Sequence, residues 1–346
     1  MSPFEHPEFD NHENIIFCRD PDLDLFAIIA IHDTTLGPAA GGCRMYPYGS
    51  FDDALTDVLR LSRGMTYKNA AAGLDLGGGK CVVMADPKSS DKARILRGFA
   101  RFIERLGGAY WTAIDVGISP KDVDVLRTVT RFAFMGESQF PEGFNPAEFT
   151  SLGGFLGIKA VMQHLTGSDD LNGATVALQG VGGTGAIMCR LLNEAGAKLI
   201  ISDVDAERID FAVQTYGAVA VAPDAIYDQE VDVFAPCALG AILNDDTIPR
   251  LKCKAVSGLA NNQLAEDRHE AALMERGILY VPDFVVNAGG IIGGSQVMFE
   301  PPAVERSNAR IAKLYDTVLE ILNRSHDEGK RTQDIADAMA KERLNA

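Results

Sequence analysis

The chain lacks the patterns that mark secreted, metal-binding or membrane proteins. Its six cysteines form no C-x-x-C pair, which disfavours both a disulfide framework and a zinc site. Its six histidines form no H-E-x-x-H pattern. No apolar run reaches the roughly 20 residues of a membrane helix, and residues 1–20 are too polar and acidic for a signal peptide. We therefore expect a cytoplasmic protein without a metal site.

Positive charge is also scarce. The sequence has 32 Lys and Arg against 48 Asp and Glu, a net charge of −16 and an isoelectric point of about 4.8. Such a surface repels nucleic acid and anionic membranes, so we expect neither as a partner. A small-molecule partner is the remaining expectation. The 346 residues are 47% hydrophobic, which is enough for two domains of ordinary size.

Hydrophobic periodicity predicts an α/β protein in two parts. The first part is expected to have strands at 15–18, 25–32, 81–84 and 110–114 and helices at 52–64, 91–106 and 121–130. A segment rich in Gly and Pro at 136–145 reads as a linker or hinge. Beyond it, strands at 175–179, 198–202, 218–221, 231–235, 255–257 and 279–281 alternate with helices, and further helices are expected at 151–165, 305–324 and 333–344. This alternation is typical of a parallel sheet covered on both faces.

One glycine-rich motif predicts a dinucleotide site between the strand at 175–179 and a helix at 186–194. It is a G-x-G-x-x-G sequence formed by Gly180, Val181, Gly182, Gly183, Thr184 and Gly185. The first glycine permits a tight turn, the second lets a pyrophosphate approach the backbone, and the third lets helix and strand pack closely. The phosphates then meet the helix N-terminus. A glycine turn that binds no nucleotide is the alternative.

The type of dinucleotide is indicated by the end of the next strand. Asp203 follows that strand, 18 residues beyond Gly185, where a carboxylate can accept a hydrogen bond from a ribose 2′-OH. A 2′-phosphate would be repelled by Asp203 and Asp205, so NAD is favoured over NADP. Arg208 is the nearby cation that could soften this preference.

Two lysines and one aspartate are the candidates for chemistry. Lys68 and Lys80 lie twelve positions apart beside small or apolar residues, and Lys80 directly follows the run Gly77, Gly78 and Gly79. Apolar surroundings disfavour a charged ammonium, so a lysine there can act as a base near neutral pH. Asp115 ends a predicted strand and could relay protons. The ordinary alternatives are solvated lysines and a turn-capping aspartate.

These residues lie in motifs that resemble the amino-acid dehydrogenases for glutamate, leucine, phenylalanine and valine, and most of all the leucine and phenylalanine branch. The similarity runs from about residue 28 to the C-terminal helix, so it covers nearly the whole chain. The matching segments in the first part are GPAAGGCRM at 37–45, GMTYKN at 64–69, GGGK at 77–80 and DVG at 115–117. Those in the second part are APCALG at 235–240, NNQL at 261–264 and PDFVVNAGG at 282–290.

The resemblance implies a substrate domain at 1–138 with the helix at about 328–346, an NAD-binding Rossmann domain at 139–327, and an active site between them. The implied reaction is reversible oxidative deamination of an L-amino acid by NAD and water. Carried over by motif, Lys68 and the Gly41 and Gly42 backbone bind the substrate carboxylate. Lys80 is the base that activates water on the imine, and Asp115 shuttles protons to and from the amino group. The remaining positions implied to contact substrate or cofactor are Asn262, Asn287, Thr150, Ala238 and Asn261.

The pocket for the substrate side chain is implied to be lined by Ala40, Ala113, Ile291 and Gly294. Glutamate enzymes carry a lysine in the place of Ala40, so glutamate is disfavoured here. Leucine enzymes carry larger residues in the places of Ala40 and Gly294. The space left unfilled favours a large apolar side chain, phenylalanine or tryptophan first, then leucine or methionine. A branched-chain enzyme is the alternative if Met65 or Val297 refills that space.

Other readings stay open at this stage. A dehydrogenase for another 2-oxo acid would not use ammonia, and a non-catalytic NAD-binding regulator would keep the fold without turnover. Relatives of this kind assemble through the first domain, so a homo-oligomer, dimer or octamer, is expected. The segment 138–149 departs from the family's usual hinge, and its aromatic residues Phe140, Phe144 and Phe149 either reach the cleft or pack the hinge.

Overall fold

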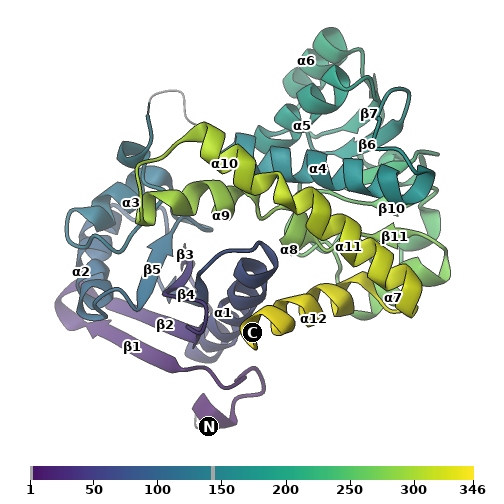
Figure 1. Cartoon of the computed structure of the whole chain (residues 1–346). Coiled ribbons are helices and arrows are strands. Elements are labelled where there is room, and N and C mark those ends of the chain that lie inside the picture. The colour runs from purple at the N-terminus through teal and green to yellow at the C-terminus, as the bar shows by residue number, and fades with distance from the viewer. Residues whose placement is uncertain (1–2, 142–144) are drawn as a thin grey trace. The chain divides into compact units, whose positions relative to one another are not determined.

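The computed structural model describes residues 3–141 and 145–346 and contains two compact units (Figure 1). The first comprises Met1–Phe144, Gly294–Pro302 and Ala340–Ala346, and the second comprises Asn145–Gly293 and Ala303–Met339. The C-terminal segment that belongs to the first unit is Ala340–Ala346. The segment expected from the sequence was longer and began at about residue 328. No helix within the described ranges is long and apolar enough to cross a membrane.

The first unit is built on a five-stranded mixed sheet in the order β1-β2-β4-β3-β5. β2 pairs antiparallel with β1 and β4, whereas β3 lies parallel to both β4 and β5. Three parallel strands therefore end at the same edge of this sheet. The strands are β1 (Asn14–Asp20), β2 (Leu25–Asp33), β3 (Ala39–Met45), β4 (Gly77–Val83) and β5 (Tyr110–Ala113).

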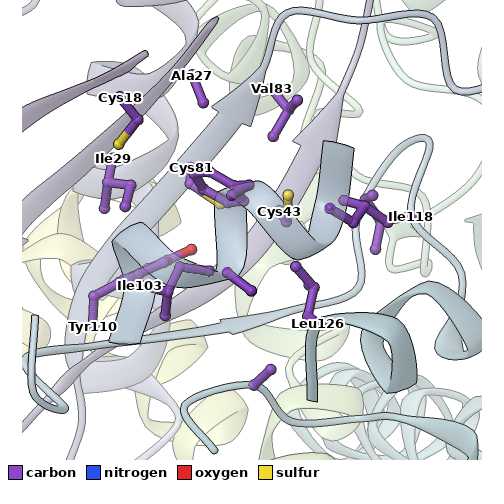
Figure 2. Packing of buried hydrophobic residues seen from close by; sticks show 14 of the residues in the cluster. Cys18, Ala27, Ile29, Cys43, Cys81, Val83, Ile103, Tyr110, Ile118 and Leu126 are labelled. Carbon is purple, nitrogen blue, oxygen red and sulfur yellow. The ribbon is translucent and has the colours of Figure 1, made fainter. Parts of the chain in front are cut away.

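The helices of the first unit are α1 (Phe51–Ala71), α2 (Lys92–Arg105) and α3 (Pro120–Arg127). Ser50 caps α1, since its side chain accepts a hydrogen bond from the Asp53 N–H. The main apolar core of the unit joins α2 and α3 to the sheet and includes the buried residues labelled in Figure 2, among them Ile29, Val83, Ile103, Tyr110 and Leu126. Alternate residues of each strand supply this core because successive side chains point to opposite faces.

Two elements of this unit differ from the sequence prediction. β3 was not predicted, because its sequence AAGGCRM lacks the β-branched and aromatic residues that favour strands. It forms because β4 and β5 supply hydrogen-bonding partners on both sides. The helix expected to end at residue 64 continues to Ala71, so Lys68 lies in its last turn. Packing of α1 against β4 outweighs the low helix propensity of Gly64.

The second unit contains a six-stranded, wholly parallel sheet in the order β8-β7-β6-β9-β10-β11. This is the 3-2-1-4-5-6 order of a Rossmann fold, which reverses direction between its first and fourth strands. The predicted α/β class with a Rossmann-type domain is therefore confirmed. The strands are β6 (Thr175–Gln179), β7 (Lys198–Ser202), β8 (Val219–Ala220), β9 (Val233–Pro236), β10 (Ala255–Val256) and β11 (Leu279–Tyr280).

The helices that follow or flank these strands complete the second unit. The predicted helix at 305–324 is divided at Ala312 into α10 and α11. The bounds are α4 (Pro146–Thr166), α5 (Gly183–Glu194), α6 (Ala206–Tyr216), α7 (Arg268–Glu275), α8 (Asp283–Val286), α9 (Gly289–Gly294), α10 (Val304–Ile311), α11 (Lys313–Glu328) and α12 (Thr332–Leu344). The unit boundary falls within α9, before Gly294, and within α12, before Ala340.

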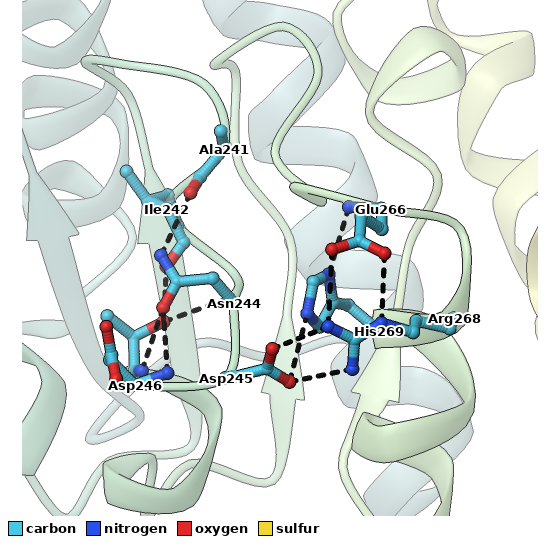
Figure 3. A network of polar contacts seen from close by, with 9 residues as sticks. Ala241, Ile242, Asn244, Asp245, Asp246, Glu266, Arg268 and His269 are labelled. Atoms are coloured by element: carbon cyan, nitrogen blue, oxygen red, sulfur yellow. Dashed lines mark hydrogen bonds and ion pairs between the residues drawn. The ribbon is translucent and has the colours of Figure 1, made fainter.

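A polar network anchors the loops that follow β9 and β10 (Figure 3). Arg268 donates to Asp245 at 2.8 Å and to Glu266 at 3.0 Å, and the Glu266 N–H donates to His269 Nδ1 at 2.9 Å. Asn244 accepts from the Thr247 N–H at 3.1 Å in the same region. These bonds hold together the two segments that leave the carboxyl ends of β9 and β10, and ligands bind at such strand ends in this fold.

Candidate functional site

Lys80 and Asp115 come together at one edge of the first sheet. Lys80 lies in β4 with 5% of its surface exposed, and its Nζ is 3.2 Å from Asp115 Oδ2. Asp115 follows β5, and β3 lies between β4 and β5. The two side chains meet across β3 because glycines occupy that strand at this level.

Gly41 and Gly42 are required by the close approach of the neighbouring strands. A methyl group at Gly41 would lie 1.8 Å from the Gly79 carbonyl oxygen, and one at Gly42 would lie 2.4 Å from the Ile114 oxygen and 2.8 Å from Asp115 Cβ. No larger residue fits without displacing backbone. The hydroxyl of buried Tyr110 donates to the Gly41 carbonyl oxygen at 2.8 Å and holds this part of β3 in place.

The glycine run before Lys80 forms the first part of the buried strand β4. A methyl group at Gly78 would lie 2.2 Å from the Thr66 backbone nitrogen, and one at Gly79 would lie 2.7 Å from the Tyr110 ring. These glycines let α1 and the ring of Tyr110 pack directly against β4. They thereby bring the last turn of α1, which carries Lys68, next to the strand that carries Lys80.

Asp115 is kept ionised by two cations. Burial alone would raise the pKa of this carboxyl, but the charges of Lys80 and Arg44 outweigh burial and lower the pKa below its ordinary value. Arg44 Nε donates to the same oxygen, Oδ2, at 2.8 Å. Arg44 lies within the GPAAGGCRM motif, but nothing in the sequence indicated a role for it. Its partner Asp57, on α1, carried no sequence signal either.

Three of the four positions assigned to the side-chain pocket lie in the first unit. Ala40 in β3 and Ala113 at the end of β5 are both buried, and Gly294 is the last residue of α9. Ile291, also in α9, belongs to the second unit. A methyl group at Gly294 would lie 2.8 Å from Met135 Sδ and 2.9 Å from Met135 Cε.

Met135 therefore fills the space that the sequence analysis left open beside Gly294. The residues considered for this were Met65 and Val297. Met135 is buried and has a φ of 70°, a left-handed conformation that is rare for a side chain of this size. Such backbone strain persists where the surrounding structure enforces it, and it often marks functional sites.

The glycine-rich turn of the second unit has the geometry of a phosphate cradle. Gly180 has a φ of 96°, and a methyl group at Gly185 would lie 2.0 Å from the Gly180 carbonyl oxygen. By contrast, nothing lies within 4 Å of the equivalent position at Gly183. The turn is thus tightly closed on the protein side and open at the start of α5, with Val181 at its tip and Thr184 in the first turn of the helix. These residues fit a dinucleotide pyrophosphate.

Asp203 lies at the end of β7 and braces this turn. Its Oδ2 accepts the Val181 N–H at 2.7 Å, and its Oδ1 accepts the Asp205 N–H at 3.0 Å. Partial burial opposes ionisation, but these backbone hydrogen bonds lower the pKa of Asp203. Each carboxylate oxygen keeps a further lone pair for a ribose hydroxyl. Arg208 is held by Asp205, with its Nε 3.2 Å from Asp205 Oδ2.

The other positions assigned to the cofactor or substrate follow strands of the same sheet or lie in adjoining helices. Ala238 follows β9 and packs over Gly180, where a methyl group would lie 2.7 Å from Ala238 Cβ. Asn287 donates to the Asn261 side chain at 2.8 Å. Asn262 is exposed with a φ of 52°. Thr150 lies in α4, and its Oγ1 would be 2.6 Å from a methyl group at Gly290.

The altered segment at 138–149 is only partly described. Phe149 is buried against α9, where a methyl group at Gly293 would lie 2.2 Å from its ring. Phe140 follows a short 3₁₀ turn, Glu137–Gln139, and Phe144 lies outside the described residues. In the parts of the chain that the structure covers, no cluster of three or more His, Cys, Asp or Glu side chains is arranged to hold a metal ion.

Both units are similar to proteins of the same family. Residues 12–131 match the family model for the Glu/Leu/Phe/Val dehydrogenase dimerisation domain, and residues 201–300 match that for glutamate/leucine/phenylalanine/valine dehydrogenase. The chain is 46% identical to the leucine dehydrogenase of Thermoactinomyces intermedius, covering 99% of this chain and 94% of the relative. It is 43% identical to the phenylalanine dehydrogenase of Bacillus thermotolerans over 98% and 90% of the two chains.

A solved structure agrees with these matches. The crystal structure of L-tryptophan dehydrogenase from Nostoc punctiforme superposes with a TM-score of 0.88 at 42% identity, covering 97% of this chain and 96% of the other. The similar proteins thus carry names for leucine, phenylalanine and tryptophan.

Proposed function

Because the chain belongs to the Glu/Leu/Phe/Val dehydrogenase family and is an amino-acid dehydrogenase, we propose that it deaminates L-amino acids with large apolar side chains. The reaction is reversible: amino acid, water and NAD give the 2-oxo acid, ammonium, NADH and a proton. The observation that carries the proposal is the Lys80–Asp115 pair, with Nζ 3.2 Å from Oδ2, beside the glycines of β3. Strict dependence of NADH oxidation on ammonia would distinguish this reaction from that of a dehydrogenase that does not use ammonia.

Three side chains of the first unit are assigned separate roles in this reaction. Lys68 binds the substrate carboxylate as a fixed positive charge, with help from the N–H groups of Gly41 and Gly42. When bound, NAD accepts a hydride from the substrate α-carbon. Lys80 removes a proton from the water that attacks the imine carbon, and Asp115 transfers protons to and from the leaving nitrogen. The lowered pKa of Asp115 means that the carboxylate is ionised at neutral pH and can accept a hydrogen bond from the substrate amino group.

NAD is supported as the cofactor by the second unit. The turn at Gly180 to Gly185 fits the pyrophosphate, and Asp203 offers carboxylate oxygens to a ribose 2′-OH. A 2′-phosphate would need a nearby cation, and Arg208 is already paired with Asp205 at 3.2 Å. Ala238, Asn261, Asn262, Asn287 and Thr150 are proposed to complete the cofactor and substrate contacts.

The preference for a large side chain is supported by the small residues Ala40, Ala113 and Gly294, with Ile291 proposed as a further part of the wall. Similarity to a tryptophan and a phenylalanine dehydrogenase is consistent with it. Two observations favour the second candidate, a branched-chain dehydrogenase. One is the 46% identity to the leucine dehydrogenase of Thermoactinomyces intermedius, and the other is the position of Met135. Met135 occupies the space beside Gly294 and would shorten the pocket there. Met is flexible and adapts to irregular gaps, so a large substrate can displace it at modest cost.

The substrate proposal is tested with NAD reduction on L-Phe, Trp, Leu, Val and Glu. We expect kcat/KM to be highest for Phe or Trp, and highest values for Leu or Val would contradict this preference. In the Met135→Ala variant, the ratio of kcat/KM for Trp to that for Leu should rise at least about tenfold. The substitution removes the three side-chain atoms Cγ, Sδ and Cε, and one methylene-sized group in an apolar pocket is already worth about 1–3 kcal/mol. Met84→Ala, in a separate apolar cluster, is the control and should leave the ratio unchanged.

Self-association is proposed through the first unit, which matches a model described as a dimerisation domain. β1 is an edge strand of that unit's sheet, and Phe17 on it is 49% exposed beside Phe51. An exposed edge with aromatic residues invites pairing with a second copy. Light scattering coupled to gel filtration should give a mass of at least two chains, and Phe17→Lys should lower it. A monomer of 37.2 kDa in the unmodified protein would contradict the proposal.

A further inference from the structure

Arg44 connects the Lys80–Asp115 pair to helix α1 through a chain of charge-assisted hydrogen bonds. Its Nε donates to Asp115 Oδ2 at 2.8 Å, and its NH1 donates to the two oxygens of Asp57 at 2.9 and 3.2 Å. The Tyr48 hydroxyl donates to Asp57 Oδ2 at 2.5 Å. Arg44 and Asp57 are each only partly exposed, at 22% and 28% of their side-chain surface. Both ends of the guanidinium are therefore held.

The two oxygens of Asp115 have different surroundings. Oδ2 receives both Arg44 Nε and Lys80 Nζ, at 2.8 and 3.2 Å. Oδ1 accepts no hydrogen bond from any residue that the structure describes. Because two cations share one oxygen, the carboxylate is held in one orientation. The remaining oxygen is left for a further donor, and the amino group of the substrate is a donor of the right kind.

The charges around Asp115 also show why one cation would not be enough. The groups that face it are Lys80 on β4, Arg44 and Cys43 on β3, and, through Arg44, Asp57 on α1 and Tyr48. Lys80 must lose and regain a proton in the proposed reaction. Arg44 stays charged at any working pH, since guanidinium does not deprotonate in proteins. Arg44 therefore leaves one positive charge beside the Asp115 carboxylate in the steps when Lys80 is neutral.

We propose that Arg44 is the positioning residue of the proton-transfer centre: it directs one oxygen of Asp115 toward the substrate nitrogen and keeps the carboxylate ionised while Lys80 exchanges protons. This inference rests on the proposed function, because that function assigns Lys80 and Asp115 their roles. Lysine would be a poor replacement. Its single ammonium cannot present a rigid fork to Asp115 and Asp57 together.

The test compares three variants in both reaction directions across the pH range. Arg44→Gln should lower kcat about 100-fold, within the range for loss of a positioned acid–base group. The acid limb of the kcat–pH profile of this variant should move to higher pH by about one unit. A neighbouring Arg lowers an Asp pKa by about 1–3 units, and the variant loses this effect on Asp115. Arg44→Lys should restore part of kcat and keep the acid limb near its original position. Arg60→Gln removes an exposed cation of α1 that pairs with Glu8 at 3.4 Å, and it should behave like the unmodified enzyme.

Several outcomes would overturn the inference. One is an Arg44→Gln enzyme with unchanged kcat and pH profile. Another is a loss of kcat that is equal at every pH and no smaller in Arg44→Lys, which would indicate a purely structural role. If Arg44→Gln does not fold, Arg44→Lys decides: about tenfold lower kcat with an unmoved acid limb supports the proposal, and unchanged kcat refutes it. A fully active Asp115→Asn enzyme would instead refute the proposed role of Asp115 itself.

Discussion

Replacing Lys80 with glutamine is expected to lower kcat for oxidative deamination about 1,000-fold, which is typical for loss of a general base. Glutamine keeps the length and polarity of the side chain but cannot take a proton from water. KM for the amino acid should change much less, because the substrate carboxylate is assigned to Lys68. Steady-state NAD reduction with the preferred amino acid measures both constants.

The fold of the Lys80→Gln variant should survive, because Asp115 keeps its ion pair with Arg44 at 2.8 Å. Lys92→Gln is the matched control. Lys92 also pairs with a partly buried aspartate of the first unit, Asp122, at 2.7 Å, yet it lies outside the proposed centre. This control should retain kcat, and both variants should give the circular dichroism spectrum of the unmodified protein. A Lys80→Gln enzyme within tenfold of normal kcat would refute the assignment of Lys80 as the base.

Replacing Gly185 with alanine is expected to weaken NAD binding at least about tenfold, equivalent to 1.4 kcal/mol. The added methyl group would lie 2.0 Å from the Gly180 carbonyl oxygen, so the turn must open. An opened turn withdraws its backbone from the pyrophosphate and separates the start of α5 from β6. Titration of NADH fluorescence measures this binding directly, without any need for turnover.

Gly183→Ala provides the control within the same turn. Gly183 occupies a variable position of the G-x-G-x-x-G pattern, and no protein atom lies within 4 Å of a methyl group there, so this variant should bind NADH nearly as well as the unmodified protein. Equal weakening by both substitutions would mean that a general loss of stability, rather than the clash at Gly185, is responsible. Unchanged binding by Gly185→Ala would contradict a cofactor site at this turn.

Local patterns explain why so much of the second unit could be predicted. Its strands are short apolar runs separated by helices, and the G-x-G-x-x-G motif follows the first of them directly. Each of these signals is contained within a few residues, and each agrees with the parallel sheet that forms. The position of Asp203 at the end of the second strand followed from the same spacing.

The structure of the first unit was harder to predict from sequence, because several of its elements depend on partners far away in the chain. β3 has almost no intrinsic strand preference and exists because β4 and β5 flank it. Arg44 and Asp115 are 71 positions apart, and nothing in either segment indicates their contact. The approach of Met135 to Gly294 likewise joins two segments that share no local pattern. For this reason the sequence did not indicate that Met135 lies beside Gly294.

The sequence by itself determined the α/β class, the Rossmann turn, and the identity of the two lysines and the aspartate proposed for chemistry. These follow from residue type and short spacing, where backbone preference and side-chain chemistry act locally. Only the tertiary structure decided that Arg44 shares Asp115 with Lys80 and that Met135 narrows the space at Gly294. Both contacts depend on how strands and helices pack across long separations, and packing is set by the whole core rather than by any one segment.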